Sequence, residues 1–415
     1  MLKKGLEKLG LRGEQAADKE IQQLHERNCF SPLNVNEIIP EEKAKVVEAL
    51  MLLQEKRDKS IKGRCVYNGK PTCDWLTRED TASPTVALES VMLTAAVDAK
   101  EERDVMTSDV PNAYIQTIIP HMEKGQERII MKIKGRLVDM LVQLAPEVYA
   151  DYVVYEKGVK VLYVQVLRAL YGMLVATLLW YKKFRSDLEE VGFVFNPYDP
   201  CVANRTERNK QHTIRFHVDD IMSSHKDKVV NDEFHKWLDK KYGKYKKVKV
   251  TRGKIHDYLG MTFDFSEKGK VQVDMSDYIE SMVNDFSVDF TEADKAATPA
   301  AEDLFNVDES ELLDKKRKEE FHTFVAKSLF VCKRARPDIH TATAALTTRV
   351  KQPNESDWNK LIRLLKYCNG TKEDKLILTI DNLHVIKWFV DVSFVVHPDF
   401  CSHTSGTMIY DKSVL

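Results

Sequence analysis

The spacing of apolar and polar positions predicts a chain built from both helices and strands. Apolar residues recur every three to four positions over residues 3–26, 40–57 and 85–98, which is the period of an amphipathic helix. Further helices are predicted at 174–190, 315–333, 338–350 and 355–367, and strands at 61–68, 72–76, 105–109, 160–167, 258–265, 270–274, 375–380 and 385–391.

One predicted β-hairpin carries two carboxylates at its tip. Residues 213–218 alternate strictly between apolar and polar, residues 221–224 continue the strand pattern, and Asp219 and Asp220 lie between the two runs. The alternation puts Asp219 on the open, polar face and leaves Asp220 to cap the turn. Adjacent carboxylates repel each other, so we expect a hard cation such as Mg²⁺ beside them, although turn capping is the commoner role of such a pair.

One apolar stretch, residues 161–181, is long enough to be considered as a membrane span. Gln165, Arg168 and Gly172 lie inside it, and a central arginine costs about 2.5–3.5 kcal/mol in a bilayer. The stretch therefore predicts a buried strand followed by a core helix, and no association with a membrane.

Composition narrows the class of protein. A chain of 415 residues that is 43% apolar can form two or three domains with real cores. Because 63 basic residues face 64 acidic ones, a uniformly basic nucleic-acid coat and an acidic disordered tail are both excluded, while local basic grooves are not. The 7 scattered cysteines include no C-x-x-C pair and predict reduced thiols.

Charge is concentrated in two blocks. Residues 236–254 contain nine basic residues and one acid, interleaved with Trp237, Tyr242 and Tyr245. This block predicts a surface for a phosphate backbone, with a merely solvated face as the alternative. Residues 285–314 contain ten acids against Lys295 and predict a hinge region that nucleic acid avoids.

A third carboxylate, Asp109, also ends an apolar strand. If its strand end lies beside that of Asp219, the two side chains can bridge two metal ions about 3.5–4 Å apart, as phosphoryl transfer requires. Tyr114 follows five residues later and could form the floor of a sugar site, where its ring would clash with a ribose 2′-hydroxyl. Core packing is the alternative role for this tyrosine.

The order of several short motifs resembles the reverse transcriptase of Copia-type LTR retrotransposons. The resemblance covers the chain from about residue 61 to residue 405. It is carried by SDVPNAY (108–114), LRALYG (167–172), DPCV (199–202), HVDD (217–220), YLGM (258–261), RPDI (336–339) and LKYCNGT (365–371).

The resemblance implies an α+β fold of the right-hand polymerase type, with fingers, palm and thumb. It assigns residues 1–290 to the reverse transcriptase, 291–372 to an acidic hinge and helical connection, and 373–415 to a truncated RNase H-like start. The implied activity is RNA-directed DNA synthesis. Two Mg²⁺ ions, with Mn²⁺ as a substitute, assist nucleotidyl transfer from a dNTP to the 3′-hydroxyl of a primer paired with an RNA or DNA template.

Site residues follow from the same resemblance. Asp109, Asp219 and Asp220 match the catalytic, metal-binding carboxylates. The implied dNTP-binding residues are Val110 through its carbonyl, Tyr114 as the steric gate, Lys62 and Arg64 at the triphosphate, and Tyr171 and Gly172 beside the nucleotide. The implied nucleic-acid-binding residues are Lys240, Lys241, Lys244, Lys246, Lys247, Lys249 and Arg252.

Two departures from the family pattern support an alternative function. His217 stands where the family usually has an aromatic residue, and residues 173–177 lack the Lys and Pro that usually follow the glycine of LRALYG. The alternative is a catalytically impaired retroelement relic that only binds primer–template nucleic acid.

The last part of the sequence resembles the first strand of a retroelement RNase H domain, WFVD (388–391). Asp391 would be the first of four carboxylates there, and the others normally lie further along, so no RNase H activity is expected. The resemblance implies a fragment of a Pol polyprotein with integrase and the remaining RNase H as partners. It also implies cytoplasmic virus-like particles whose product is destined for the nucleus.

Overall fold

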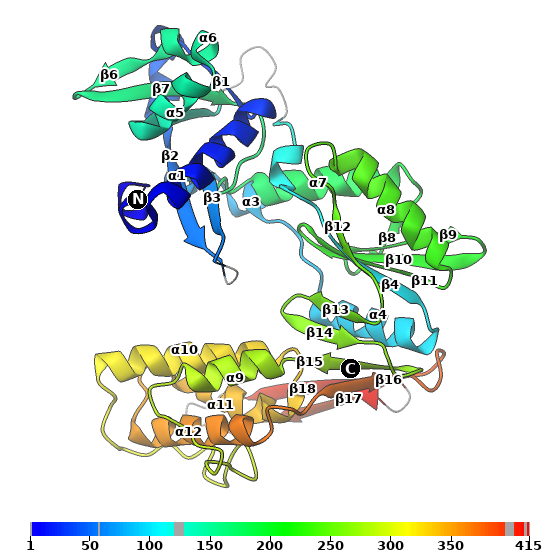
Figure 1. Ribbon diagram of the computed structural model, residues 1–415. Helices are drawn as coiled ribbons and strands as arrows, with labels where there is room; N and C mark the ends of the chain where they lie inside the picture. Colours follow the sequence, from blue (N-terminus) through cyan, green and yellow to red (C-terminus); the bar gives the residue numbers. More distant parts are fainter. Residues whose placement is uncertain (1, 57–58, 120–127, 395–401, 411–412, 415) are drawn as a thin grey trace. The chain divides into compact units, whose positions relative to one another are not determined.

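A computed structural model describes residues 2–56, 59–119, 128–394, 402–410 and 413–414 (Figure 1). The chain divides into two compact units, each assembled from separate stretches of sequence. Unit 1 contains Met1–Thr85, Val110–Val194 and Tyr242–Lys247, and unit 2 contains Val86–Asp109, Phe195–Lys241 and Val248–Leu415. Helices and mainly antiparallel sheets occur in both, which confirms the α+β class. The division by function into 1–290, 291–372 and 373–415 stays a prediction.

Unit 1 is organised around a six-stranded sheet of order β1-β7-β5-β2-β3, with β6 paired to β7. Among the described strands of this sheet, β2 and β5 are the pair that runs parallel. Its elements are α1 (Leu2–Glu26), β1 (Phe30–Pro32), α2 (Pro40–Ala44), β2 (Val47–Glu55), β3 (Ile61–Tyr67), α3 (Arg78–Thr81), β5 (Ile130–Lys134), α5 (Arg136–Leu144), α6 (Pro146–Tyr149), β6 (Val154–Glu156), β7 (Val159–Val166) and α7 (Ala176–Glu189).

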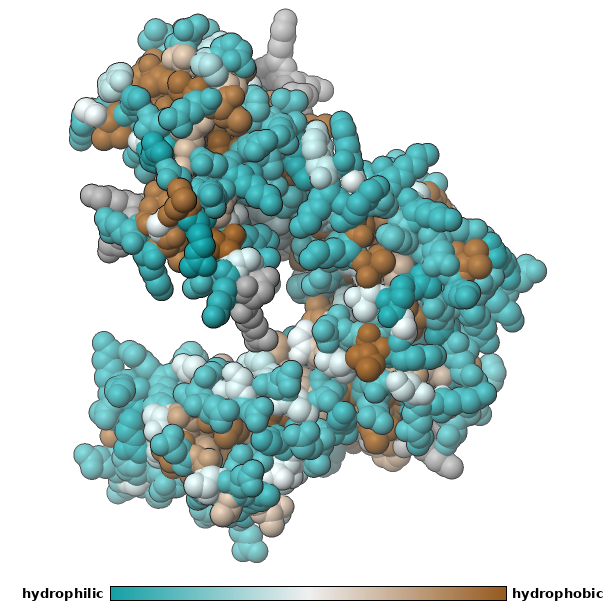
Figure 2. All heavy atoms as spheres, in the orientation of Figure 1, coloured by the Kyte–Doolittle hydropathy of each residue, from teal (hydrophilic) through white to brown (hydrophobic). Residues whose placement is uncertain are grey.

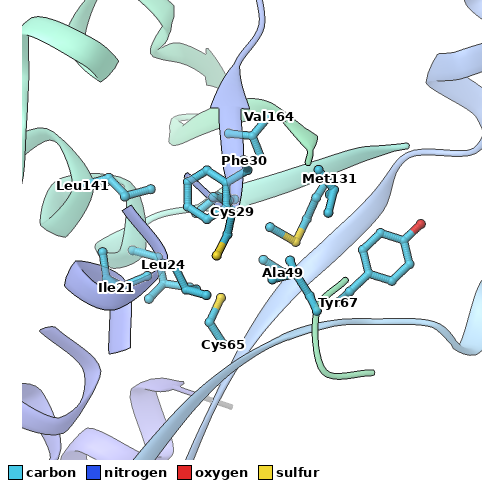
Figure 3. Close-up of a cluster of buried hydrophobic side chains, with 14 of the residues drawn as sticks. Ile21, Leu24, Cys29, Phe30, Ala49, Cys65, Tyr67, Met131, Leu141 and Val164 are labelled. Carbon is cyan, nitrogen blue, oxygen red and sulfur yellow. The ribbon is translucent and has the colours of Figure 1, made fainter. Parts of the chain in front are cut away.

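The core of unit 1 lies between this sheet and two helices. Ile21 and Leu24 of α1 and Leu141 of α5 pack onto apolar strand residues such as Met131 and Val164 (Figure 3). All are almost completely buried, so the apolar face of the amphipathic helix predicted for residues 3–26 packs against this sheet.

Two secondary-structure predictions in unit 1 are wrong. The predicted helix 40–57 ends at Ala44, and residues 47–55 form β2 instead. Val47, Ala49 and Met51 alternate toward the core and are 1%, 5% and 2% exposed, so tertiary pairing overrides the helical preference of this leucine-rich run. The predicted strand 72–76 is also absent, because Lys70–Asp74 forms a 3₁₀ turn, η2.

Unit 2 contains the sheet that bears the candidate site, of order β12-β4-β11-β10-β9-β8. Helix α4 contacts one face through Asp98, and α8 contacts the other through Asn231. The bounds are α4 (Leu88–Lys100), β4 (Asp104–Asp109), β8 (Val194–Phe195), β9 (Val202–Glu207), β10 (Lys210–His217), β11 (Asp220–His225), α8 (Lys228–Tyr242) and β12 (Lys249–Thr251).

The remainder of unit 2 consists of a four-stranded sheet, a group of helices and a three-stranded sheet. The predicted helices from residue 315 onward are all confirmed. The bounds are β13 (Ile255–Tyr258), β14 (Met261–Asp264), β15 (Lys270–Asp274), α9 (Ser276–Asn284), α10 (Lys315–Cys332), α11 (His340–Arg349), α12 (Glu355–Gly370), β16 (Leu376–Thr379), β17 (Ile386–Ser393), β18 (His403–Tyr410) and β19 (Ser413–Val414).

Strand β17 differs from the other strands in its exposure. It lies at the edge of the three-stranded sheet, and Trp388, Phe389, Val390 and Val392 are 65%, 58%, 67% and 60% exposed. Successive strand residues point to opposite faces, so apolar side chains meet solvent on both faces of β17. On the face shown in Figure 2 the surface is mostly hydrophilic, with apolar side chains in separate groups.

The apolar stretch 161–181 is divided between strand β7 and helix α7, as predicted. Among the residues that the structure describes, no helix combines the length and apolar character needed to cross a bilayer.

Candidate functional site

The carboxylates singled out from the sequence lie on neighbouring strands of the unit 2 sheet. β4 pairs antiparallel with β11, and Asp109 and Asp220 are direct Cα partners in that pairing. β10 and β11 form the predicted hairpin, in which His217 is opposite Asp220 and Asp219 lies in the two-residue turn. The sheet therefore brings Asp109 close to Asp219 and Asp220, which follow it by more than one hundred residues in the sequence.

The turn that carries Asp219 is conformationally strained. Val218 precedes it with a φ of 58°, in the left-handed region that β-branched residues avoid. A two-residue hairpin turn needs such a φ, and glycine or asparagine usually supplies it. Valine there costs about 1–2 kcal/mol, so surrounding contacts must hold the turn in place.

The three carboxylates form a strongly negative site. Partial burial, followed by the charges of Asp219 and Asp109, raises the pKa of Asp220 to about 6. Neither Asp109 nor Asp220 has a basic side chain within ion-pair distance among the described residues. The repulsion between Asp109 and Asp220 is therefore not relieved by an ion pair to either carboxylate, which favours the binding of a cation.

A cavity of about 190 Å³ opens beside Asp109 and Asp220. The hydroxyls of Ser108 and Tyr258 are buried at its wall without a hydrogen-bond partner in the described part of the chain. The complete lining is Thr107, Ser108, Asp109, Asp220, Ile221, Lys249, Thr251, Asp257 and Tyr258. Two carboxylates surrounded by hydroxyl oxygens provide the hard donor set that Mg²⁺ prefers.

A complete protein cage for a metal is not preformed. In the described ranges, no three His, Cys, Asp or Glu side chains converge as a metal centre. The donors present suit a weaker arrangement, in which one or two carboxylates and the phosphates of a substrate hold Mg²⁺ together. The three-aspartate metal site inferred from the sequence stays a prediction.

One expectation about the hairpin is wrong. The face that carries Thr213, Arg215, His217 and Asp219 was expected to be open, but Thr213 and Arg215 are 2% and 0% exposed. Helix α4 covers this part of the sheet, and Asp98 of α4 pairs with the Arg215 guanidinium. Polar residues at alternate positions indicated a solvent face because the sequence shows no partner for a buried charge.

Several of the predicted dNTP-binding residues lie together in unit 1. The Tyr114 and Tyr171 rings meet edge to face with centroids 4.9 Å apart, and the Arg64 guanidinium is 5.5 Å from the Tyr171 ring centroid. The Tyr114 hydroxyl lies 3.2 Å from the Thr177 hydroxyl. Tyr114 is only partly buried, so its ring retains an accessible surface.

Gly172, next to Tyr171, is required by the backbone. Its φ is 87°, and a Cβ atom at this position would lie 2.2 Å from the Tyr67 carbonyl oxygen. The Tyr67 amide also donates a hydrogen bond to the Tyr171 carbonyl at 2.8 Å. These contacts fix the segment of Tyr171 against strand β3, which carries Lys62 and Arg64.

A group of unpaired cations adjoins this segment. Burial, and then the nearby charges of Arg64, Lys56 and Lys246, lower the pKa of Lys62. Among the described residues, no carboxylate lies within ion-pair distance of Lys62, Arg64 or Lys246. Glu20, whose charge raises the pKa of Lys62, is largely buried and accepts a hydrogen bond from the Cys65 amide.

Arg27 is a residue that no sequence pattern had indicated. It is 5% exposed, and its guanidinium lies 4.5 Å from the centroid of the Tyr245 ring. The Tyr245 hydroxyl also donates to the Glu26 carbonyl at 3.3 Å. This contact fastens residues 242–247 to unit 1 and explains why Lys246 lies near Lys62.

The basic block is consequently divided between the two units. Lys244, Lys246 and Lys247 belong to unit 1, and the other predicted nucleic-acid-binding residues, Lys240, Lys241, Lys249 and Arg252, belong to unit 2. Lys249 is the Cα partner of Asp109 on strand β12. Arg252 forms ion pairs with Asp104 and Asp232, both at 2.7 Å, so its charge is already compensated. Nucleic-acid binding by the block stays a prediction.

Val110 and Asp391 complete the predicted set. Val110 directly follows Asp109 and is fully buried. Asp391 is exposed on β17, opposite Ser405 of β18. In the part of the chain that the structure describes, Asp391 does not belong to any group of three or more His, Cys, Asp or Glu residues that could hold a metal ion.

Comparison with known proteins finds similarity to reverse transcriptases and to retrotransposon polyproteins. Residues 144–302, which include Asp219 and Asp220, match the reverse transcriptase (RNA-dependent DNA polymerase) family. The Retrovirus-related Pol polyprotein from transposon RE2 of Arabidopsis thaliana is 22% identical over 83% of this chain and 21% of its own length. The corresponding polyprotein from transposon TNT 1-94 of Nicotiana tabacum is 22% identical over 76% of the chain and 22% of its own length.

The solved structures that match the chain include a foamy viral protease–reverse transcriptase in complex with double-stranded DNA. It is 11% identical with a TM-score of 0.46, over 96% of this chain and 53% of that one. Telomerase from Candida albicans is 10% identical with a TM-score of 0.33, over 86% and 64%. The chain spans about a fifth of the length of the curated relatives. The matches to the family and to the transposon polyproteins confirm the resemblance to the reverse transcriptases of Copia-type retrotransposons.

Proposed function

We propose that this chain is an RNA-directed DNA polymerase that adds deoxynucleotides to a primer paired with an RNA or DNA template. The observation that carries the proposal is the direct pairing of Asp109 with Asp220 across β4 and β11, with Asp219 in the adjoining turn. Carboxylates on adjacent strand ends are what two-metal nucleotidyl transfer requires, and the family match supports the same reaction.

Asp109, Asp219 and Asp220 would hold two Mg²⁺ ions, with Mn²⁺ as a substitute. Bound there, divalent ions acidify the attacking primer hydroxyl and neutralise charge on the leaving pyrophosphate. The protein's own part is to keep three mutually repelling carboxylates close together before substrate arrives. The carbonyl of Val110 is the further oxygen that we assign to this site.

The residues of unit 1 would bind the incoming nucleotide. The cations Lys62, Arg64 and Lys246 have no ion-pair partner in the described structure and suit a triphosphate. Tyr114, held by Tyr171, would exclude a 2′-hydroxyl and so select deoxynucleotides. Exposed lysines of the basic block, including Lys240 and Lys249, would contact phosphates of the primer–template duplex.

A second function has one specific observation in its favour. His217 is the cross-strand partner of Asp220, where an aromatic residue is usual in the family. A relic that binds primer–template without synthesis would keep the fold and the basic residues.

Primer extension separates the two functions. The purified chain is given an oligo(dT) primer on poly(rA) with dTTP and either Mg²⁺ or Mn²⁺. The polymerase proposal requires extension that Asp219→Asn abolishes while salt-sensitive duplex binding persists. If the folded parent binds the duplex but extends no primer with either ion, the chain is a relic that only binds primer–template nucleic acid.

The setting of this activity is also proposed from the relatives. Because the curated relatives are Pol polyproteins several times longer, we place the chain with integrase and the remaining RNase H in such an assembly. The corresponding location is a cytoplasmic virus-like particle, with DNA product destined for the nucleus. Asp391 would contribute the first carboxylate of the RNase H site.

A further inference from the structure

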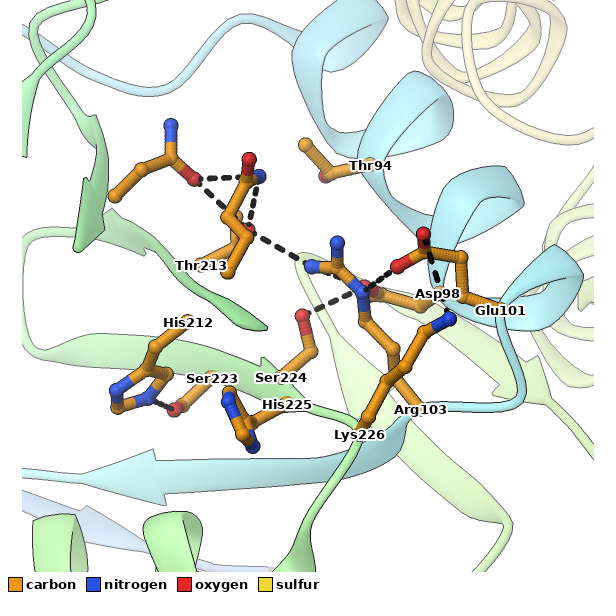
Figure 4. A network of polar contacts seen from close by, with 12 residues as sticks. Thr94, Asp98, Glu101, Arg103, His212, Thr213, Ser223, Ser224, His225 and Lys226 are labelled. Carbon is orange, nitrogen blue, oxygen red and sulfur yellow. Dashed lines mark hydrogen bonds and ion pairs between the residues drawn. The ribbon is translucent and has the colours of Figure 1, made fainter. Parts of the chain in front are cut away.

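Asp98, near the end of α4, is a buried carboxylate that contacts strands β10 and β11 of the candidate site and the residue that precedes β4. Figure 4 shows Asp98 with two of these partners, Ser224 and Arg103. The Asp98 side chain is 1% exposed. The Arg215 guanidinium of β10 lies 2.8 Å from Asp98 Oδ2, and the Ser224 hydroxyl of β11 donates to Asp98 Oδ1 at 2.6 Å. The third contact is Arg103, which directly precedes β4 and lies 3.7 Å from Oδ1.

These contacts are placed symmetrically about the aspartates of the hairpin. Arg215 lies four residues before Asp219, and Ser224 lies four residues after Asp220. Arg103 also donates to the Thr213 hydroxyl of β10 at 2.9 Å, and so connects the start of β4 to the same hairpin. One carboxylate therefore joins the strand of Asp109 to the two strands around Asp219 and Asp220.

The Arg215–Asp98 ion pair is costly as a source of stability. Arg215 is completely buried, and its Nε and Nη1 atoms have no hydrogen-bond partner among the described residues. Desolvating such a pair can cost more than its attraction returns, and well-packed apolar residues of similar volume are often equally stable or better. An ion pair adds specificity of geometry, because Asp98 and Arg215 can meet in only one alignment of α4 and β10.

The hairpin needs such a constraint. A one-residue slip of a strand would turn every side chain to the opposite face and would remove Asp220 from its position opposite Asp109. The strained φ of Val218 means that the turn alone does not favour the observed geometry. The contacts of Asp98 with Arg215 on β10 and with Ser224 on β11 constrain the register of the hairpin from outside the turn.

We propose that Asp98 and Arg215 are positioning residues, which fix β4, β10 and β11 in the register that holds Asp109, Asp219 and Asp220 together. The inference rests on the proposed polymerase function, since it concerns the geometry of those aspartates. It assigns a role in synthesis to two side chains that touch neither nucleotide nor template.

The test replaces the ion pair without leaving an unpaired charge. In Asp98→Leu/Arg215→Met both charges of the pair are absent, and the Arg103 guanidinium keeps its ion pair with Glu101 at 2.7 Å. The variant is therefore expected to fold with a melting temperature close to that of the parent. The single variant Asp98→Asn strands the Arg215 charge and is expected to be much less stable. Ser224→Ala removes one hydrogen bond and serves as the mild member of the series.

Two readouts distinguish positioning from stability. In the double variant kcat for primer extension should fall about 100-fold while KM for dNTP changes little, as expected for aspartates displaced by a fraction of an ångström to 1 Å. Independently of synthesis, Mn²⁺ should broaden the methyl signal of Met222, the strand neighbour of Asp220, in ¹³C-methionine-labelled parent protein. This broadening should require several-fold more Mn²⁺ in the double variant.

Each remaining outcome is decisive. A double variant with parental kcat and parental Mn²⁺ broadening overturns the positioning role, and so does a double variant that fails to fold, because the pair is then structural. If the parent protein shows Mn²⁺ broadening but no synthesis, the proposed polymerase function fails while the effect of the ion pair on the carboxylates is still measured.

Discussion

Asp109 and Asp220 are direct partners across two antiparallel strands, although 110 residues separate them in the sequence. Backbone pairing thus holds two negative charges together that repel each other in the absence of a cation. The repulsion between the two carboxylates lowers the stability of the folded chain, which is common at functional sites.

Asp220→Asn should separate stability from activity. Without divalent ions, the substitution removes repulsion with Asp109 and Asp219, so the melting temperature should rise above that of the parent. Primer extension should be lost. Mg²⁺ should raise the melting temperature of the parent and have little effect on the variant. Melting curves in EDTA and in Mg²⁺ measure both effects, and a variant that Mg²⁺ stabilises as strongly as the parent would contradict this account.

His212 should make the protein sensitive to mild acid. It is fully buried on β10, with Nδ1 3.3 Å from the Arg205 Nε donor and Nε2 2.8 Å from the Ser223 hydroxyl. Since Arg205 can only donate, Nδ1 accepts and Nε2–H donates, and the Ser223 hydroxyl then donates to Asn231. The network therefore requires a neutral imidazole, and burial lowers the pKa of His212 to about 3.

The sign of the pH effect follows. The unfolded chain binds a proton below about pH 6.5, whereas the folded chain does so only near pH 3, so stability is complete above 6.5 and declines on acidification. At pH 5 the loss from His212 is about 2 kcal/mol. Urea unfolding between pH 5 and 7.5 should show a flatter pH dependence in His212→Gln. Ser223→Ala, which keeps the imidazole, should retain most of the slope.

Lys246 should contribute to nucleotide binding, whereas Lys240 should not. Lys246 lies close enough to Lys62 to act on its charge, and Lys240 is an exposed residue of helix α8 in the other unit. Loss of a charge-assisted contact to a triphosphate in Lys246→Gln should raise KM for dNTP about tenfold. Steady-state primer extension with Lys240→Gln as the matched control tests this, since that variant should weaken only duplex binding. Equal effects of the two substitutions on KM would refute the assignment.

Gly172 and Gly192 provide a matched pair for backbone strain. Both have a φ of 87°, but a Cβ at Gly172 would lie 2.2 Å from the Tyr67 carbonyl oxygen, whereas nothing lies within 4 Å at Gly192. Gly192→Ala should cost only the conformational penalty of about 1–2 kcal/mol. Gly172→Ala should cost at least about 2 kcal/mol more, because the Tyr171 segment must move away from β3. Chemical unfolding of both variants gives the difference directly, and equal losses would show that the steric contact is relieved at no cost.

The local pattern of the sequence was sufficient for the hairpin and for the strand that ends at Asp109. Strict alternation over residues 213–218 and two polar turn residues predicted β10 and β11, and an aspartate at the end of an apolar run predicted the position of Asp109. These features depend on strand period and turn chemistry, which are encoded by neighbouring residues.

Features that depend on distant partners were not predictable. Arg215 looked like a solvent-facing residue because its partner, Asp98, is more than one hundred residues away in the sequence. Residues 47–55 looked helical because their place in a sheet is set by β3 and β5. The division of the basic block between two units depends on the contact of Arg27 with Tyr245, for which no sequence pattern exists.

The two-sided apolar exposure of β17 has a practical consequence for work with the isolated chain. An uncovered hydrophobic edge strand is a template on which further copies can add by backbone pairing. Concentrated preparations should therefore accumulate filaments or precipitate through Trp388 and its neighbours. Lysine at Val390 or Val392, or removal of the chain from Ile386 onward, should keep the protein dispersed.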